Sequence, residues 1–137
     1  MSASTNKPYW MPGMTTLVLE QEPRAVRIET DDERLTVHLT DGRTLSVPLE
    51  WYPRLTFATP VERANVELFR DGHAIYWPDL DEDLHVPGLL AGRRSMENQR
   101  SFERWKEEMR RRRKDPNPKP WGKVLPADSS GVEPSAG

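Results

Sequence analysis

The pattern of apolar and polar positions predicts a small antiparallel sheet in the first half of the chain. Apolar residues alternate with polar ones over residues 24–30, 34–40 and 43–49. Such alternation is typical of strands that bury one face. Asp41-Gly42 separates the second and third segments and favours a type I′ hairpin turn, because both positions of that turn need positive φ. We therefore expect a three-stranded meander with one apolar face.

A sheet with one apolar face must be covered, and the sequence predicts one helix for this role. Thr59 to Glu62 combines an N-cap threonine, a proline at the first helical position and a glutamate three residues after the cap. The predicted helix runs from Pro60 to about Phe69 and leads into a β-prone run, HAIYW, at 73–77. The expected fold class is α+β, a small antiparallel meander sheet with one packed helix, over residues 14–92.

The segments on either side of this domain have different compositions. Residues 1–13 are polar and contain two prolines, which predicts a disordered leader. The apolar residues from Leu17 to Leu19 predict a short strand or a lead-in segment. Residues 93–114 predict an exposed, basic amphipathic helix. Residues 115–137 are rich in proline, end in SSGVEPSAG and predict a disordered tail.

The net charge of −2 conceals an acidic body and a basic arm. Residues 1–92 carry 8 Lys/Arg and 15 Asp/Glu, whereas residues 93–114 carry 10 basic and 4 acidic residues. Such an arm can attract polyanions or dock against the chain's own acidic surface.

Composition excludes chemistry that depends on cysteine, and it disfavours a membrane or secreted protein. The chain has no cysteine, which excludes disulfides, thiolate catalysis and cysteine-based zinc sites. No apolar run approaches the roughly 20 residues that span a bilayer. The first residues given lack the basic start and continuous apolar stretch typical of a secretion signal. We expect no membrane contact and a cytoplasmic location.

The acidic turn after the β-prone run is the first candidate site. Trp77 is followed by a proline and by Asp79, Asp81 and Asp83 at alternate positions. The spacing begins like a calcium-binding EF-hand loop, but Leu84 stands where glycine is required and Leu90 where glutamate is required. We expect a structural turn that also offers a contact surface for a partner, with no metal bound.

The histidines provide an alternative, because His73 and His85 flank this turn. With Asp79 or Asp83 they could form a small metal site or an acid/base cluster. No metal-binding histidine spacing, nucleophile motif or phosphate-binding glycine loop accompanies them. We therefore expect no enzyme activity and no cofactor.

The predicted C-terminal helix carries two further candidate sites. Phe102, Trp105 and Met109 fall on one face by their +3 and +4 spacing, which is typical of a helix that docks in a partner's groove. A basic run follows, which could contact phosphates in a salt-sensitive way; it consists of Arg110, Arg111, Arg112, Arg113 and Lys114.

Motifs across residues 25–92 resemble the bacterial domain of unknown function 2442. They are L-T-D-G-R at 39–43, V-P-L at 47–49, Y-P-R-L at 52–55, A-T-P-x-E-R at 58–63, and I-Y-W-P-D-L-D-E-D-L with G-L-L-A-G across 75–92. The resemblance implies a small α+β domain, alone or fused to a helix-turn-helix, which this chain lacks. It also implies a small companion protein encoded nearby, in an arrangement resembling toxin–antitoxin pairs. No catalytic residues are established for the family.

These observations favour a non-enzymatic protein-binding module, the antitoxin-like member of a two-gene pair, whose partner is a small, toxin-like protein. The expected partner surface consists of Trp77, Asp79, Asp81, Asp83, Phe102, Trp105 and Met109. One alternative is a nucleic-acid-associated regulator that uses the basic run at 110–114 for weak contact. A second is a small metal-binding protein or enzyme at the His/Asp turn.

Overall fold

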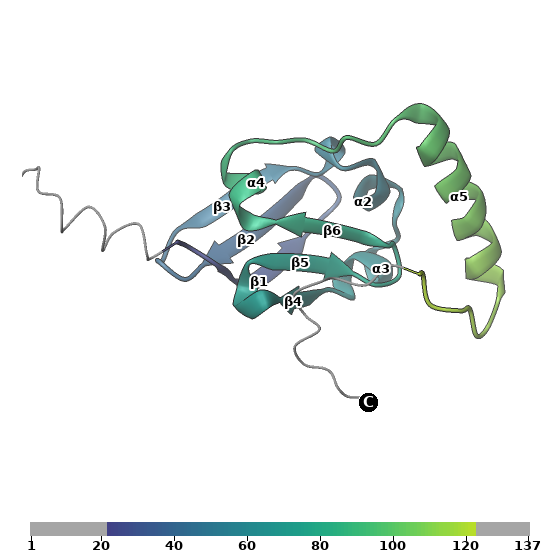
Figure 1. Ribbon diagram of the computed structural model, residues 1–137, viewed down its shortest axis with the longest axis horizontal. Coiled ribbons are helices and arrows are strands. Elements are labelled where there is room, and N and C mark those ends of the chain that lie inside the picture. Colours follow the sequence, from purple (N-terminus) through teal and green to yellow (C-terminus); the bar gives the residue numbers. More distant parts are fainter. Residues whose placement is uncertain (1–21, 123–137) are drawn as a thin grey trace, which may run out of the picture.

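Two three-stranded antiparallel sheets and several short helices make up residues 22–122, the part of the chain that the computed structural model describes (Figure 1). The first sheet contains β1 (Ala25–Thr30), β2 (Arg34–Leu39) and β3 (Thr44–Pro48), and the second contains β4 (Glu67–Phe69), β5 (Ala74–Trp77) and β6 (Glu82–His85). The helices are η1 (Leu49–Trp51), α2 (Pro53–Phe57), α3 (Pro60–Ala64), η2 (Arg70–Gly72), α4 (Val86–Leu90) and α5 (Gln99–Lys114). The predicted leader at 1–13, the segment at 17–19 and residues 123–137 lie outside the described residues.

The predicted meander is confirmed as the first sheet. Its strands pair in the order β1-β2-β3, and the alternating residues Leu35, Val37 and Leu39 of β2 are buried. The hairpin between β2 and β3 is present, but its turn is not type I′. Gly42 has a φ of +92°, whereas Asp41 is not among the residues with positive φ. One left-handed glycine at the end of the loop is typical of a three-residue connection, in which the glycine forms a bulge.

The predicted helix at 60–69 begins as expected and ends early. Thr59 Oγ1 accepts from the Glu62 backbone N–H at 3.1 Å, and the Glu62 carboxylate accepts from the Thr59 N–H at 2.9 Å. However, α3 stops at Ala64, and the last three residues of the predicted helix form β4, which pairs with β5. Pairing with a neighbouring strand therefore outweighs the local helical signal.

The second sheet, rather than a helix, covers the apolar face of the first sheet. Figure 1 shows β4, β5 and β6 lying across β1, β2 and β3. The largest buried side chains come from both sheets and their connections, and they form one hydrophobic core that includes Trp77, Ile75, Leu80, Leu35 and Val37. The α+β class is thus confirmed, and the prediction of one covering helix is corrected to a covering sheet.

The predicted C-terminal helix is present as α5 and stands along one side of the sheets (Figure 1). Its N-terminus is capped by Asn98, whose side chain accepts from the Ser101 N–H at 2.8 Å. Only its outer face is exposed, because Trp105 and Met109 are 4% and 1% exposed and belong to the core. The helix therefore uses its apolar stripe to dock on its own domain.

The first eight residues of the predicted disordered tail follow an ordered path. Trp121 is partly buried, its indole N–H donates to the Asp79 carbonyl at 3.3 Å, and the Arg112 guanidinium lies 4.2 Å from its ring centroid. The prediction of a disordered tail stays a prediction, and the structure adds these contacts for residues 115–122. Proline-rich composition disfavours helices and strands, but it does not prevent one tryptophan from anchoring an irregular segment.

Gly72 is expected to be irreplaceable in the turn before β5. Its φ is +96°, and a Cβ atom placed on it would lie 2.4 Å from the Ala25 carbonyl oxygen. Gly72→Ala should lower the free energy of unfolding by about 2–3 kcal/mol, from left-handed strain and from displacement of β1. Gly42→Ala is the matched control, because its φ is +92° with no atom within 4 Å, and about 1 kcal/mol is expected there. Chemical denaturation measures both, and equal losses would contradict a steric role for Gly72.

Candidate partner-binding site

The tryptophan of the Trp-Pro-Asp turn is part of the core. Trp77 ends β5, is 0% exposed, and donates its indole N–H to the Arg63 carbonyl at 3.0 Å. Leu80, at the other end of the turn, is also fully buried. Trp77 therefore has no surface to offer a partner, which corrects its assignment to the partner-binding surface.

The three aspartates of the turn differ in exposure. Asp79 is exposed and accepts a hydrogen bond from the Asn65 side-chain amide at 3.0 Å. The side chains of Asp81 and Asp83 are only 22% and 15% exposed, and their carboxylates lie 3.9 Å from Arg54 and 3.2 Å from His85. Only Asp79 is positioned as an open contact residue of the kind predicted for all three.

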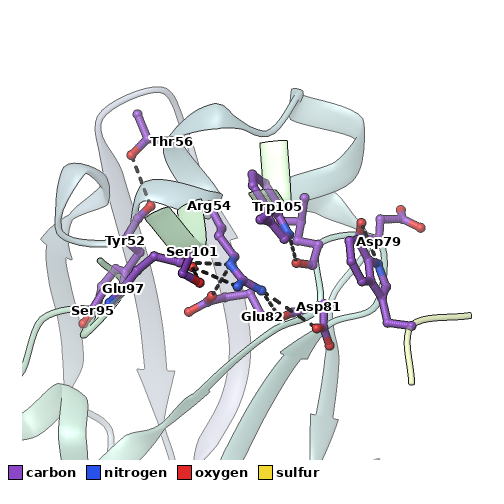
Figure 2. A network of polar contacts seen from close by, with 12 residues as sticks. Tyr52, Arg54, Thr56, Asp79, Asp81, Glu82, Ser95, Glu97, Ser101 and Trp105 are labelled. Carbon is purple, nitrogen blue, oxygen red and sulfur yellow. Dashed lines mark hydrogen bonds and ion pairs between the residues drawn. The ribbon is translucent and has the colours of Figure 1, made fainter. Parts of the chain in front are cut away.

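Arg54 lies at the centre of a polar network that joins the first half of the domain to α5 (Figure 2). Its Nε and Nη2 donate to the two carboxylate oxygens of Glu97, at 2.6 and 2.9 Å, and its Nη1 donates to the Asp81 carbonyl at 2.8 Å. The Glu82 carboxylate lies 4.0 Å away, and the guanidinium carbon lies 5.2 Å from the Trp105 ring centroid. One arginine of α2 thus connects the acidic turn, the residues before α5 and α5 itself.

Burial and pairing shift the pKa values of the charged groups in this network in opposite directions. Burial alone would raise the pKa of Glu97, but hydrogen bonds from Arg54 and Ser101 and the charge of Arg54 outweigh it and hold the pKa below its ordinary value. Burial would likewise lower the pKa of Arg54, yet Glu97 and the neighbouring carboxylates raise it above the ordinary value. Both groups therefore stay charged at neutral pH.

A second ion pair fixes the far end of α5. Arg113 donates to the Glu62 carboxylate oxygens at 3.0 and 2.8 Å. Burial would raise the pKa of Glu62, but hydrogen bonds from Arg113 and the Thr59 N–H hold it below the ordinary value. Between the two ion pairs, the Trp105 indole N–H donates to the Leu80 carbonyl at 2.8 Å. The helix is thus held at three points along its length.

Acidic pH is expected to weaken these attachments. Glu62 and Glu97 have lowered pKa values in the folded protein, so their stabilising effect is present above the ordinary value of 4.5 and is lost as the pH falls below it. The midpoint of urea unfolding should decrease over this range. The double variant Glu62→Gln/Glu97→Gln should show a smaller decrease. An unchanged pH dependence in that variant would mean that other carboxylates control acid unfolding.

The basic run at 110–114 is largely engaged within the chain. Arg111 and Arg112 pair with Glu108, at 2.7 and 3.7 Å, and Arg112 also donates to the Lys119 carbonyl. With Arg113 held by Glu62, only Arg110 and Lys114 of the predicted nucleic-acid-binding residues take no part in the ion pairs found within residues 22–122. The alternative of nucleic-acid binding therefore has fewer available charges than the sequence indicates.

An apolar groove lies between α2 and α5. It has a volume of about 440 Å³ and is lined by Glu50, Pro53, Thr56, Phe57, Phe102 and Lys106. Phe57 and Phe102 are half-buried and meet edge to face, with ring centroids 6.4 Å apart. Phe102 is thus the member of the predicted apolar stripe that remains accessible, whereas Trp105 and Met109 are covered.

Cations cover the aromatic rings on the α5 side of this groove. Lys106 Nζ lies 4.7 Å from the Phe102 ring centroid, and the guanidinium carbons of Arg110 and Arg113 lie 5.9 and 4.7 Å from that of Phe57. Such stacking keeps the rings in place while leaving the groove lined by carbon atoms. Sequence reasoning missed Phe57 because its apolar neighbour is supplied by a helix 45 residues away, a distance that no local periodicity reports.

The histidines and Asp79 each contact a different group. The His73 ring nitrogen Nδ1 is 2.9 Å from the Arg70 carbonyl, His85 lies 3.2 Å from Asp83, and Asp79 contacts Asn65. Over residues 22–122 no group of three or more potential ligand residues could hold a metal ion. The structure therefore does not bring His73, His85 and the aspartates of the turn together as one group of ligands.

Together these features define a small α+β domain with a docked C-terminal helix, in which the most distinctive motif residues are internal. Within the described part of the chain, no helix is long and apolar enough to cross a membrane. The chain belongs to the family described as protein of unknown function DUF2442, whose model matches residues 23–95. The predicted family and the predicted range of about 25–92 are confirmed.

Two solved structures are similar to this chain. A protein of unknown function from Rhodospirillum rubrum is 33% identical, with a TM-score of 0.51, over 56% of this chain and 95% of that chain. An uncharacterized protein from Chromobacterium violaceum is 20% identical, with a TM-score of 0.49, over 76% of this chain and 95% of that one. No curated protein matches the chain. The family match ends at residue 95, before α5 begins.

Proposed function

We propose that this protein is a non-enzymatic protein-binding module, and that it holds a small companion protein at the groove between α2 and α5. The observation that carries the proposal is the pair of half-buried aromatic rings, Phe57 and Phe102, in a lining made almost entirely of carbon. Aromatic side chains that line a preformed groove are typical anchors of protein interfaces.

Most other residues of the predicted partner surface are less accessible, which favours the groove as the binding location. Trp77, Trp105 and Met109 are buried, so a partner could reach them only if the domain opened. The side chains of Asp81 and Asp83 are only partly exposed. Asp79 and Phe102 remain accessible. Of these two, Phe102 lies in a concave apolar surface, where a partner gains most from excluding water.

The resemblance to the family supports a partner encoded beside this protein, in an antitoxin-like role. A docked α5 gives such a partner a composite surface, one wall from residues matched by the family model and the other from α5. Nucleic-acid contact through Arg110 to Lys114 stays a prediction, and steep weakening of binding with salt would be its signature.

The proposal is tested by co-expressing the chain with the products of the neighbouring genes. We expect a stoichiometric complex on size-exclusion chromatography with light scattering. Hydrogen exchange of the complex should show added protection over residues 53–57 and 99–110, on the two walls of the groove. A complex whose protection lies wholly on the sheets, or the absence of any complex, would contradict the proposal.

A further inference from the structure

We infer that the partner segment that enters the groove is acidic as well as apolar: one or two aliphatic or aromatic anchors with a carboxylate on the α5 side. This inference rests on the proposed function and adds the chemistry of the ligand. It is carried by the distribution of charge around the groove rather than by the groove's apolar lining.

Next to the groove lining, α5 carries a cation without an acidic partner among the described residues. Arg110 is exposed and stacks over Phe57, and none of the ion pairs found within residues 22–122 involves it. Arg113, which stacks on the same ring, is paired with Glu62, and Lys106 is paired with Glu103 at 3.1 Å. Arg110 is therefore the guanidinium at this wall that is available for a carboxylate from outside.

The opposite wall has the opposite charge. Glu50 lines the groove, is exposed, and takes part in no ion pair found in the described part of the chain. A segment with an anion toward Arg110 meets favourable charge at the α5 wall, whereas a segment with a cation there meets repulsion. Charge complementarity of this kind selects both the partner and its orientation in the groove.

The size of the groove limits what enters it. A volume of about 440 Å³ lies at the lower end of the range typical of pockets for single small ligands. It holds a few side chains of the partner segment. The ligand is therefore a short anchor segment, with its acidic residue close in sequence to its apolar residue.

Selection of short random peptides on the full chain, displayed on phage, tests this chemistry. Peptides enriched on the wild type should combine an aliphatic or aromatic residue with a neighbouring Asp or Glu. Arg110→Glu should weaken the best acidic peptide about fivefold. Arg104→Glu is the matched control, because Arg104 is exposed on the outer face of the same helix, and it should leave binding unchanged.

The outcomes separate this inference from the proposed function. Peptides that bind wild type, lose binding in Phe102→Glu, and show neither acidic enrichment nor sensitivity to Arg110→Glu would overturn the inference and leave the groove as the binding site. Peptides unaffected by both Phe102→Glu and the groove-filling Thr56→Tyr, or the absence of any enriched peptide, would overturn the groove and the inference together.

Discussion

Replacing Trp77 with alanine is expected to lower the free energy of unfolding by about 3–5 kcal/mol, a large part of the stability of a domain this small. The side chain is 0% exposed and lies in the core between the two sheets. Its loss leaves a cavity and also removes the indole donor from the Arg63 carbonyl, which α3 needs at its C-terminus. Urea denaturation followed by circular dichroism measures the effect.

Trp51→Ala provides the matched control, because the same side chain is removed from a half-buried position. The Trp51 ring contacts the Arg94 guanidinium, 4.7 Å from the ring centroid, at the surface. We expect a loss of less than half that of Trp77→Ala. Equal losses at the two positions would show that burial in the core does not explain the role of the Trp-Pro-Asp turn.

Arg54→Met is expected to cost about 3–5 kcal/mol, because it leaves the partly buried Glu97 carboxylate without its partner and the Asp81 carbonyl without a donor. The loss should be local: amide hydrogen exchange over residues 99–114 should speed up more than exchange in β2 and β5. Arg54→Met/Glu97→Gln should recover part of the loss, since it removes the unpaired charge.

Arg54→Lys separates charge from geometry in the same network. Lysine keeps the positive charge but cannot donate in parallel to both oxygens of Glu97 while also reaching the Asp81 carbonyl. We expect the free energy of unfolding of Arg54→Lys to lie between those of the wild type and Arg54→Met. A lysine variant as stable as the wild type would mean that the charge alone holds α5 in place.

Local patterns predicted the elements whose partners are close in sequence. Alternation over residues 34–40 and 43–49 identified a hairpin because each strand pairs with its neighbour. The capping box at Thr59 identified the start of α3 for the same reason. These signals depend on contacts within a few residues, so they can be read without knowledge of the fold.

Contacts between residues far apart in sequence determine the features that the sequence pattern does not predict. Residues 67–69 join β5 as a strand, although the capping box before them indicates a helix. Arg54 and Glu97 are separated by 43 residues, and no spacing rule connects them. The amphipathic pattern of α5 was read correctly, but it could not say whether its apolar face meets a partner or the chain's own body.

The same limit applies to the candidate site. Trp77 and Phe102 both belonged to the predicted partner surface, yet one is in the core and the other lines an open groove. Aromatic residues are enriched in cores and interfaces alike, so composition alone does not separate the two roles. The burial of each side chain distinguishes the two roles. It places Trp77, in the most distinctive motif of the chain, in the hydrophobic core.

The dissociation constant of the complex with the companion protein, compared between wild type and Phe102→Glu, tests the proposed site most directly. Val61→Glu is the control, because it places the same charge on a side chain that is 78% exposed outside the groove, and thermal melting of each variant confirms that it is folded. We predict that Phe102→Glu weakens binding at least about tenfold, or about 1.4 kcal/mol, and that Val61→Glu binds as the wild type does. A folded Phe102→Glu variant that binds with wild-type affinity would contradict the groove as the binding site.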